Sequence, residues 1–102
     1  MFEDPPKLTT DVRALTGIRG IDLSLRCSVS ANPPASIIWL DDNENEIIHQ
    51  HQYNIQYDNQ TSVLSFIVYP LTHSKVLYFC RSNNSIGTVE KLINIAGKIK
   101  IS

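Results

Sequence analysis

The strongest constraint on the fold lies in residues 20–29, GIDLSLRCSV, where apolar and polar side chains alternate from Ile21 onward. Side chains at every second position of an extended strand lie on one face, so this segment predicts a half-buried β-strand. The apolar side consists of Ile21, Leu23, Leu25 and Cys27. No window of the chain repeats apolar residues at helical spacing, and the chain is therefore expected to be built from strands.

Further strand-like segments follow, and turn-forming residues separate them. Prolines at 33–34, the polar run at 41–46 and Pro70 end successive segments, because proline cannot donate to a ladder. Residues 83–87, NNSIG, predict a hairpin turn in which Gly87 is free to take a positive φ. The predicted strands are residues 12–17, 20–29, 36–40, 62–69, 75–82 and 88–95, with one or two short strands within 47–57. This succession of short strands is typical of an all-β sandwich.

Length and charge exclude several classes of function. The 102 residues suit one domain, and the net charge is −1 without any cluster of Lys and Arg, so no nucleic-acid partner is expected. No apolar run reaches the roughly 20 residues that cross a bilayer. The chain contains no glycine-rich phosphate loop and no paired nucleophile and base. We therefore expect no enzymatic activity, no cofactor and no small-molecule substrate.

Two groups of titratable residues have ordinary explanations. His49 and His51 would share one face of a strand, and His73 is a conceivable third ligand, but a metal site needs three or four converging ligands. We expect no metal and exposed polar histidines instead. Asp41 and Asp42 are adjacent, so their side chains point apart, and a solvated turn is the favoured interpretation.

Four residues carry a resemblance to a known family. Cys27 and Cys80 lie 53 positions apart on apolar-patterned strands, Trp39 follows the first by 12, and Tyr78 precedes the second by two. This order resembles that of the immunoglobulin fold. The surrounding motifs agree: GIDLSLRC resembles G-x-x-V-x-L-x-C, ANPPASIIW resembles N-P-x-P…I-x-W, and YFCRSNNSIG resembles Y-x-C-x-A-x-N-x-x-G. The last motif, in which Ser82 replaces the alanine, resembles the I-set (intermediate set) of adhesion molecules, receptors and muscle giants.

The resemblance implies an all-β fold, a two-sheet antiparallel immunoglobulin-like sandwich of I-set type with one inter-sheet disulfide. That disulfide would join Cys27 to Cys80, with Trp39 packed on the bond and Leu25 and Tyr78 in the core. The Tyr78 hydroxyl would bond back to the preceding turn. The alternative is a reduced cysteine pair, as in intracellular muscle immunoglobulin domains. The chain departs from the family where Ser74 and Val76 replace the usual Asp-x-Gly/Ala.

The predicted domain covers residues 7–95. Residues 1–6 are expected to be a leader or linker, and residues 96–102 a linker or the start of a following domain. The triplets NQT at Asn59 and NNS at Asn83 fit the glycosylation pattern and fall in predicted turns. Together with a disulfide they favour an extracellular location, in a fragment of a secreted protein or of a cell-surface protein whose parent chain holds it at the membrane.

One strand carries more apolar residues than a half-buried strand needs. If Tyr78 and Cys80 point inward, Leu77, Phe79 and Arg81 must point out of the sheet, and the same parity around Trp39 sends Ile38 and Leu40 outward. Adjacent strands would join the four apolar side chains into one patch with Arg81 as a charge at its rim, and soluble monomers rarely leave such patches uncovered. The prediction is a face that binds another protein or a second copy of this chain.

Two alternatives to that binding face remain open. A neighbouring domain or the segment EIIHQ, residues 46–50, would cover the patch without any partner. The sequence favours an extracellular recognition module of an adhesion molecule or receptor. The alternative function is a structural spacer domain in an intracellular muscle-type protein.

Overall fold

The computed structural model describes residues 3–69 and 75–98, and these residues form strands and one short 3₁₀-helix. The elements are β1 (Asp4–Thr16), β2 (Ile21–Asn32), β3 (Ser36–Leu40), β4 (Glu46–Ile47), β5 (Asn54–Asp58), β6 (Thr61–Val68), β7 (Leu77–Asn83), β8 (Thr88–Asn94) and η1 (Ala96–Lys98). No helix in this part of the chain is long and apolar enough to pass through a bilayer.

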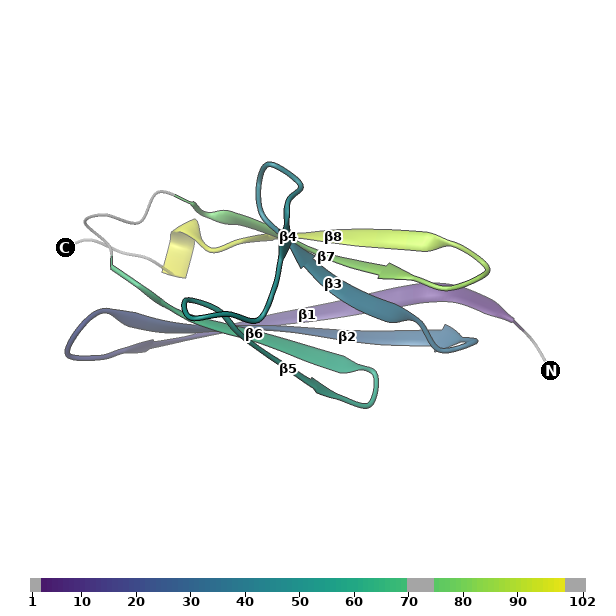
Figure 1. Ribbon diagram of the computed structural model, residues 1–102, viewed down its shortest axis with the longest axis horizontal. Helices are drawn as coiled ribbons and strands as arrows, with labels where there is room; N and C mark the ends of the chain where they lie inside the picture. Colours follow the sequence, from purple (N-terminus) through teal and green to yellow (C-terminus); the bar gives the residue numbers. More distant parts are fainter. Residues whose placement is uncertain (1–2, 70–74, 99–102) are drawn as a thin grey trace.

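The described strands form two four-stranded antiparallel sheets packed face to face (Figure 1). One sheet has the order β1-β2-β6-β5 and the other the order β4-β3-β7-β8. The molecule is elongated, with extents of 52 × 24 × 23 Å. The predicted two-sheet antiparallel sandwich is confirmed.

The first strand is much longer than the predicted segment 12–17. β1 begins at Asp4 and pairs along the whole of β2, from Asp4 opposite Asn32 to Thr16 opposite Ile21. The alternation of buried and exposed side chains along β1 is hard to recognise in the sequence, because threonines occupy half-buried and exposed positions alike. The register shifts between Asp4 and Lys7, where two prolines lack the N–H groups of a regular ladder. β1 thus starts before residue 7, and η1 occupies residues 96–98 of the predicted linker, while 99–102 lie outside the described residues.

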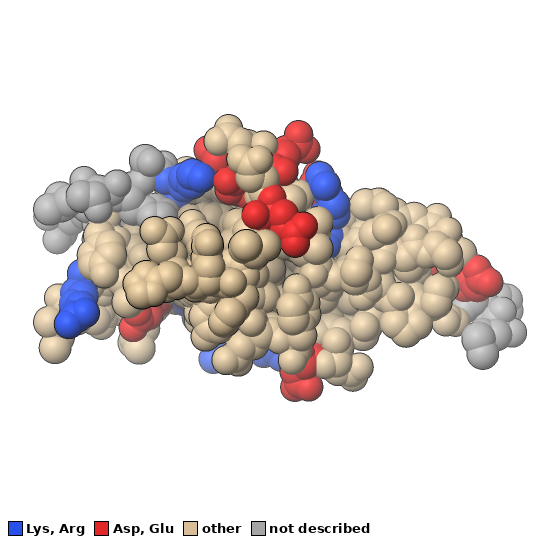
Figure 2. Space-filling model, in the orientation of Figure 1, with Lys and Arg blue, Asp and Glu red and all other residues tan. Residues whose placement is uncertain are grey.

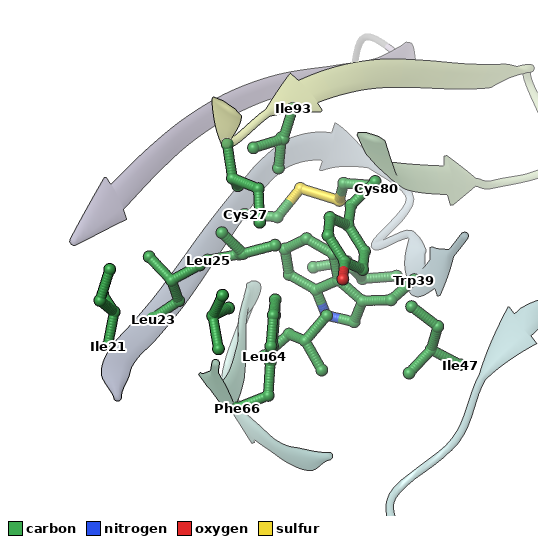
Figure 3. Packing of buried hydrophobic residues seen from close by; sticks show 14 of the residues in the cluster. Ile21, Leu23, Leu25, Cys27, Trp39, Ile47, Leu64, Phe66, Cys80 and Ile93 are labelled. Atoms are coloured by element: carbon green, nitrogen blue, oxygen red, sulfur yellow. A yellow bond between two sulfur atoms is a disulfide. The ribbon is translucent and has the colours of Figure 1, made fainter. Parts of the chain in front are cut away.

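The core lies between the sheets, around a disulfide (Figure 3). Cys27 on β2 and Cys80 on β7 are bonded, with their Cα atoms 6.5 Å apart, so the predicted inter-sheet disulfide is confirmed. Trp39 pairs with Cys80 in the neighbouring strand, and its indole packs beside the sulfur bridge. Leu25 and Tyr78 are also fully buried. Burial raises the pKa of the Tyr78 hydroxyl well above its ordinary value.

The turn before β7 falls largely in residues 70–74, outside the described residues. The expected bond from the Tyr78 hydroxyl to this turn therefore stays a prediction. Pro70, His73 and Ser74 also lie outside the described residues. The predicted strand end at Pro70, the conceivable metal ligand His73 and the departure from the family motif at Ser74 therefore stay predictions.

A buried serine occupies the position where the family motif has alanine. The Ser82 hydroxyl donates a hydrogen bond of 2.7 Å to the carbonyl oxygen of Ser36 on the neighbouring strand β3. The bond satisfies a hydroxyl that would otherwise be costly to bury, so the substitution is compatible with the core.

The β7–β8 turn is organised by an asparagine side chain. The Asn84 Oδ1 accepts the N–H groups of Ile86 and Gly87 at 2.9 and 3.1 Å. Its Nδ2 donates to the carbonyl oxygens of Asp4 and Pro33 at 3.0 and 2.9 Å. One amide therefore ties this turn to the start of β1 and to the bend after β2. Gly87 does not use the positive φ that was open to it; among the described residues positive φ occurs at Glu44 and Asn59.

Candidate protein-binding face

The candidate site is the solvent side of the sheet β4-β3-β7-β8, called here the outer face. Its members are Ile38, Leu40, Leu77, Phe79, Arg81, Glu90 and Leu92. Neighbouring residues on the same strands, such as Ile37, Tyr78 and Ile93, are buried in the core. The pleat therefore sends the members of the outer face to the opposite side, as strand parity predicts.

The strand register arranges this face in rows. Phe79 on β7 lies opposite Leu40 on β3 and opposite Leu92 on β8, which makes an apolar row across three strands. Arg81 lies in the next row, opposite Ile38 and Glu90. Directly opposed side chains in antiparallel strands lie within contact distance. The structure thus brings the five predicted residues together on one face.

The predicted exposure of Leu40 is wrong. Its side chain is only 2% exposed, whereas Ile38, Leu77 and Phe79 are half-buried. Leu40 has a residue opposite it on both sides, Glu46 on β4 and Phe79 on β7. The loop that follows Leu40 also reaches across this face, since Glu44 contacts Arg81. These neighbours remove Leu40 from any surface that a partner could touch.

The charge predicted at the rim of the patch is paired within the domain. The Arg81 guanidinium donates to Glu90 Oε1 through Nε at 2.9 Å and through one terminal nitrogen at 2.6 Å. The same terminal nitrogen lies 3.5 Å from Glu44 Oε1. Figure 2 shows acidic side chains gathered on the β3–β4 loop, with basic side chains on both sides of it. Arg81 therefore offers a partner a neutralised group rather than a free cation.

Leu92 belongs to this face and was not identified from the sequence. Its side chain is 51% exposed, more than any of the apolar residues predicted for the patch. The signal that could have found it is the parity of β8, in which the neighbour Ile93 is buried. Beside the apolar row, a hollow of about 530 Å³ is lined by Ile38, Arg81, Val89 and Glu90 together with polar side chains of Ser36, Asn83 and Thr88.

The expected solvated role of Asp41 is wrong, because its side chain is buried and structural. Oδ1 accepts the N–H groups of Asn43 and Asn45, each at 2.9 Å, and Oδ2 accepts from Lys75 Nζ at 3.2 Å. The hydrogen bond from the Asn45 N–H, more than the ammonium of Lys75, holds the pKa of Asp41 below its ordinary value. The bond to Asp41 in turn raises the pKa of Lys75. This pair fixes the start of the loop that covers Leu40.

The other predicted polar sites lie apart from the outer face. His49 Nδ1 accepts the N–H of Ile55 at 3.0 Å, which gives that side chain a structural role, and His51 is exposed. Among the described residues no three His, Cys, Asp or Glu are grouped to hold a metal. Asn59 is exposed in the β5–β6 turn, and Asn83 is exposed at the end of β7, where its Oδ1 accepts the Thr88 hydroxyl at 2.7 Å.

The family is decided by a match over nearly the whole chain. The model of the immunoglobulin I-set domain matches residues 6–96. This chain is a member of the I-set family. The family consists of structural and binding modules and is not a known enzyme family.

Two curated relatives resemble this I-set domain in sequence. A titin homolog of Caenorhabditis elegans is 30% identical over 103 residues, covering 93% of this chain. The slow-type myosin-binding protein C of Homo sapiens is 30% identical over 89 residues, covering 87% of this chain. The chain spans 8% of the human protein and, to the nearest per cent, 0% of the nematode protein. Each relative is thus many times longer than this domain.

A solved structure supports the fold independently. One chain of a mutant titin M10–obscurin-like 1 Ig complex matches with a TM-score of 0.70 and 20% identity, covering 89% of this chain and 90% of the matched chain. At that identity the likeness shows the fold alone.

The relatives overturn the predicted extracellular location. Titin and myosin-binding protein C are muscle proteins of the cell interior, so the expected cell-surface or secreted location is wrong. The roles in cell adhesion and the glycans expected at Asn59 and Asn83 depended on that location and lose their basis with it. The inference failed because a buried cysteine pair is a feature of this core in either redox compartment.

Proposed function

We propose that this domain is one structural module of a long, intracellular, muscle-type protein. The observation that carries the proposal is how the chain and its relatives overlap. Each relative is 30% identical along nearly all of this chain but is itself many times longer. A domain of this kind occupies one position in a series, in which its dimensions and stability set the spacing of its neighbours.

The geometry of the domain suits a place in a series. β1 begins at one end of the long axis, and η1, which follows β8, lies toward the other end (Figure 1). A polypeptide that enters and leaves at opposite ends transmits tension along the long axis. β1 is hydrogen-bonded to β2 from Asp4 to Thr16, and the Asn84 side chain holds the carbonyl of Asp4. Pulling on the start of β1 must therefore break several bonds together.

Mass spectrometry of the native parent protein tests this location and role. Peptides that contain Asn59 and Asn83 are expected to be unmodified, and the tagged parent protein is expected in the contractile lattice of muscle cells. A glycan at either asparagine, or surface labelling of intact cells by an antibody against this domain, would overturn the proposal.

The outer face supports a second function, the binding of another protein. The half-buried Phe79 lies beside the half-exposed Leu92, and Ile38 and Arg81 in the next row line a hollow large enough for a side chain of a partner. A domain related in fold has been solved within a complex of titin M10 and obscurin-like 1. The partner is another protein or a second copy of this chain, and it would contact Ile38, Leu77, Phe79 and Leu92.

The expected affinity of this face is modest. Full burial of a large apolar side chain contributes about 1.5–3 kcal/mol, and three of these four side chains are already half-buried in the free domain. Association costs an estimated 4–15 kcal/mol in lost freedom. Binding would therefore be weak for one domain and would become effective only where many copies are aligned.

The variants Leu92→Asp and Phe79→Asp test the binding face. Each is expected to remove the partner that co-purifies with the native parent protein, or to abolish self-association in sedimentation equilibrium of this chain. The control is Ile86→Asp, an exposed apolar residue in the β7–β8 turn. Unchanged binding by the Leu92 variant would contradict the proposal, and since Phe79 is half-buried, a melting temperature measured for each variant separates lost binding from lost folding.

A further inference from the structure

Four exposed large apolar side chains cluster at one end of the molecule. They are Leu15, Ile18, Ile67 and Tyr69, each between 44% and 106% exposed, and we call them the end patch. Only four other large apolar residues in the described part of the chain are comparably exposed, and they come from β4–β5, β5, the β7–β8 turn and β8. A group of this kind at a single end calls for a partner more strongly than scattered exposed residues do.

The strand register places the members of the end patch next to one another. Leu15 on β1 lies opposite Asp22 on β2, and Asp22 lies opposite Ile67 on β6, so one row crosses the solvent side of the sheet. Ile18 lies at the tip of the β1–β2 turn, which is closed by a bond from Gly17 N to Gly20 O. A Cβ added at Gly20 would approach Ile67 Cγ2 within 3.2 Å, so this turn packs closely against β6.

Tyr69 extends the end patch into a hollow beside β6. β5 pairs with β6 only from Thr61 to Ser65, which leaves Phe66 and Ile67 without a β5 neighbour. The segment 50–53 passes there instead, and a hollow of about 370 Å³ remains, lined by Tyr69, Ile67, Phe66, His51 and their neighbours. The end patch thus combines protruding side chains with a recess.

The last described element of the chain, η1, lies at the same end as the end patch. The β1–β2 turn and η1 both lie toward the same end of the long axis (Figure 1). A stable interface between free proteins buries about 800 Å² on each partner, more than four partly exposed side chains supply. A neighbour on the same polypeptide needs much less contact, because a short tether gives an effective concentration in the millimolar range. The position and the small area therefore favour a tethered occupant.

We propose that the end patch is the docking surface for the immunoglobulin domain that follows this one in the parent protein. This inference rests on the proposed function as a module in a series. Asp22 lies within the row between Leu15 and Ile67, Arg19 adjoins Ile18 in the turn, and Lys98 lies in η1. The matching surface is therefore an apolar one with charges of both signs, a basic group facing Asp22 and acidic groups at the edge. Docking holds the two domains at a defined angle and makes the pair stiffer than a flexibly linked one.

Hydroxyl-radical footprinting of the intact parent protein tests this assignment. Tyr69 and Tyr57 have the same chemistry and similar exposure in this domain, 48% and 61%, but Tyr57 lies on β5 outside the end patch. We expect Tyr69 to be oxidised several-fold more slowly than Tyr57 in the parent protein. Replacing both Leu15 and Ile18 by Asp is expected to restore fast oxidation of Tyr69, and the control Ile86→Asp is expected to leave it slow.

Three outcomes overturn the inference in distinguishable ways. If Tyr69 and Tyr57 react at similar rates in a parent protein that carries a following immunoglobulin domain, the docking fails and the proposed function survives. If protection of Tyr69 increases with protein concentration, the occupant is a second molecule and not the tethered neighbour. If no immunoglobulin domain follows this one in the parent sequence, both the inference and the proposed role in a series are wrong.

Discussion

The indole of Trp39 is hydrogen-bonded across the core to Ser62. Trp39 Nε1 on β3 donates to Ser62 Oγ on β6 at 2.9 Å, and the two strands belong to different sheets. Both residues are buried. The bond sets the rotation of the large ring beside the disulfide, since the indole nitrogen can only donate and needs an acceptor when it is buried.

The variant Ser62→Ala is expected to destabilise the domain. Removing the hydroxyl leaves the indole N–H of Trp39 buried without its acceptor, which costs about 1–3 kcal/mol of the free energy of unfolding. Urea denaturation followed by tryptophan fluorescence measures this loss at a single site, because the chain contains one tryptophan. The control Ser65→Ala removes a longer, partly exposed contact of 3.4 Å to Ser24 and should change stability by less than about 0.5 kcal/mol. Equal effects of the two variants would argue against a role for the cross-core bond.

Reduction of the disulfide is expected to lower stability without changing the fold. Cys27 and Cys80 are 53 residues apart, and in the chain-entropy model a loop of that length contributes about 4 kcal/mol. Because the thiols remain buried next to Trp39, the circular dichroism of the sheets should be retained below the lowered denaturation midpoint. The comparison is between the oxidised protein and the same sample in excess reductant, and an unchanged midpoint would mean that the thiols are unpaired in the native protein.

Gly20→Ala is expected to destabilise the β1–β2 turn. A Cβ at this position would clash with the carbonyl oxygen of Val68, so the backbone of β6 or of the turn must move. Such overpacking costs on the order of 1–3 kcal/mol. Gly97→Ala is a matched control, because a Cβ there meets nothing within 4 Å and should change the free energy of unfolding by less than about 0.5 kcal/mol. Thermal denaturation of both variants distinguishes the crowded glycine from the open one.

Asp41 is expected to make stability depend on pH in the acidic range. Its pKa is lowered in the folded protein, so its contribution is fully present above its ordinary pKa of about 3.9 and is lost as the pH falls through the folded-state value. Asp41→Asn should lower the free energy of unfolding at neutral pH by about 1 kcal/mol and flatten its decline with acid. Denaturant titrations at several pH values measure both effects.

A second variant identifies which partner of Asp41 matters more. Lys75→Gln should cost less than Asp41→Asn, because the backbone N–H groups of Asn43 and Asn45 stay bound to the carboxylate. The reverse order of the two variants would show that the ion pair, with its half-exposed lysine, dominates at this site.

The family and the core were predictable from local patterns. The alternation in residues 21–29 assigns Leu25 and Cys27 to the buried face, and the same parity around Trp39 and Tyr78 correctly divides β3 and β7 between core and outer face. These assignments depend only on the period of a strand and on the spacing of large or reactive side chains. The extracellular location, by contrast, was inferred from the cysteine pair and the two glycosylation triplets, and the intracellular relatives show that this inference was wrong.

The sequence by itself determined which side chains point inward, because the direction of a side chain is a property of its own strand. Only the tertiary structure decided what covers the outward ones. Leu40 points outward and is nevertheless buried between Glu46 and Phe79, whereas Leu92 in the same row remains half-exposed. Asp41 likewise becomes buried because the chain folds back on it and Lys75 approaches from the segment just before β7. Burial depends on neighbours that are remote in sequence, and the alternation of side chains within one strand carries no information about those neighbours.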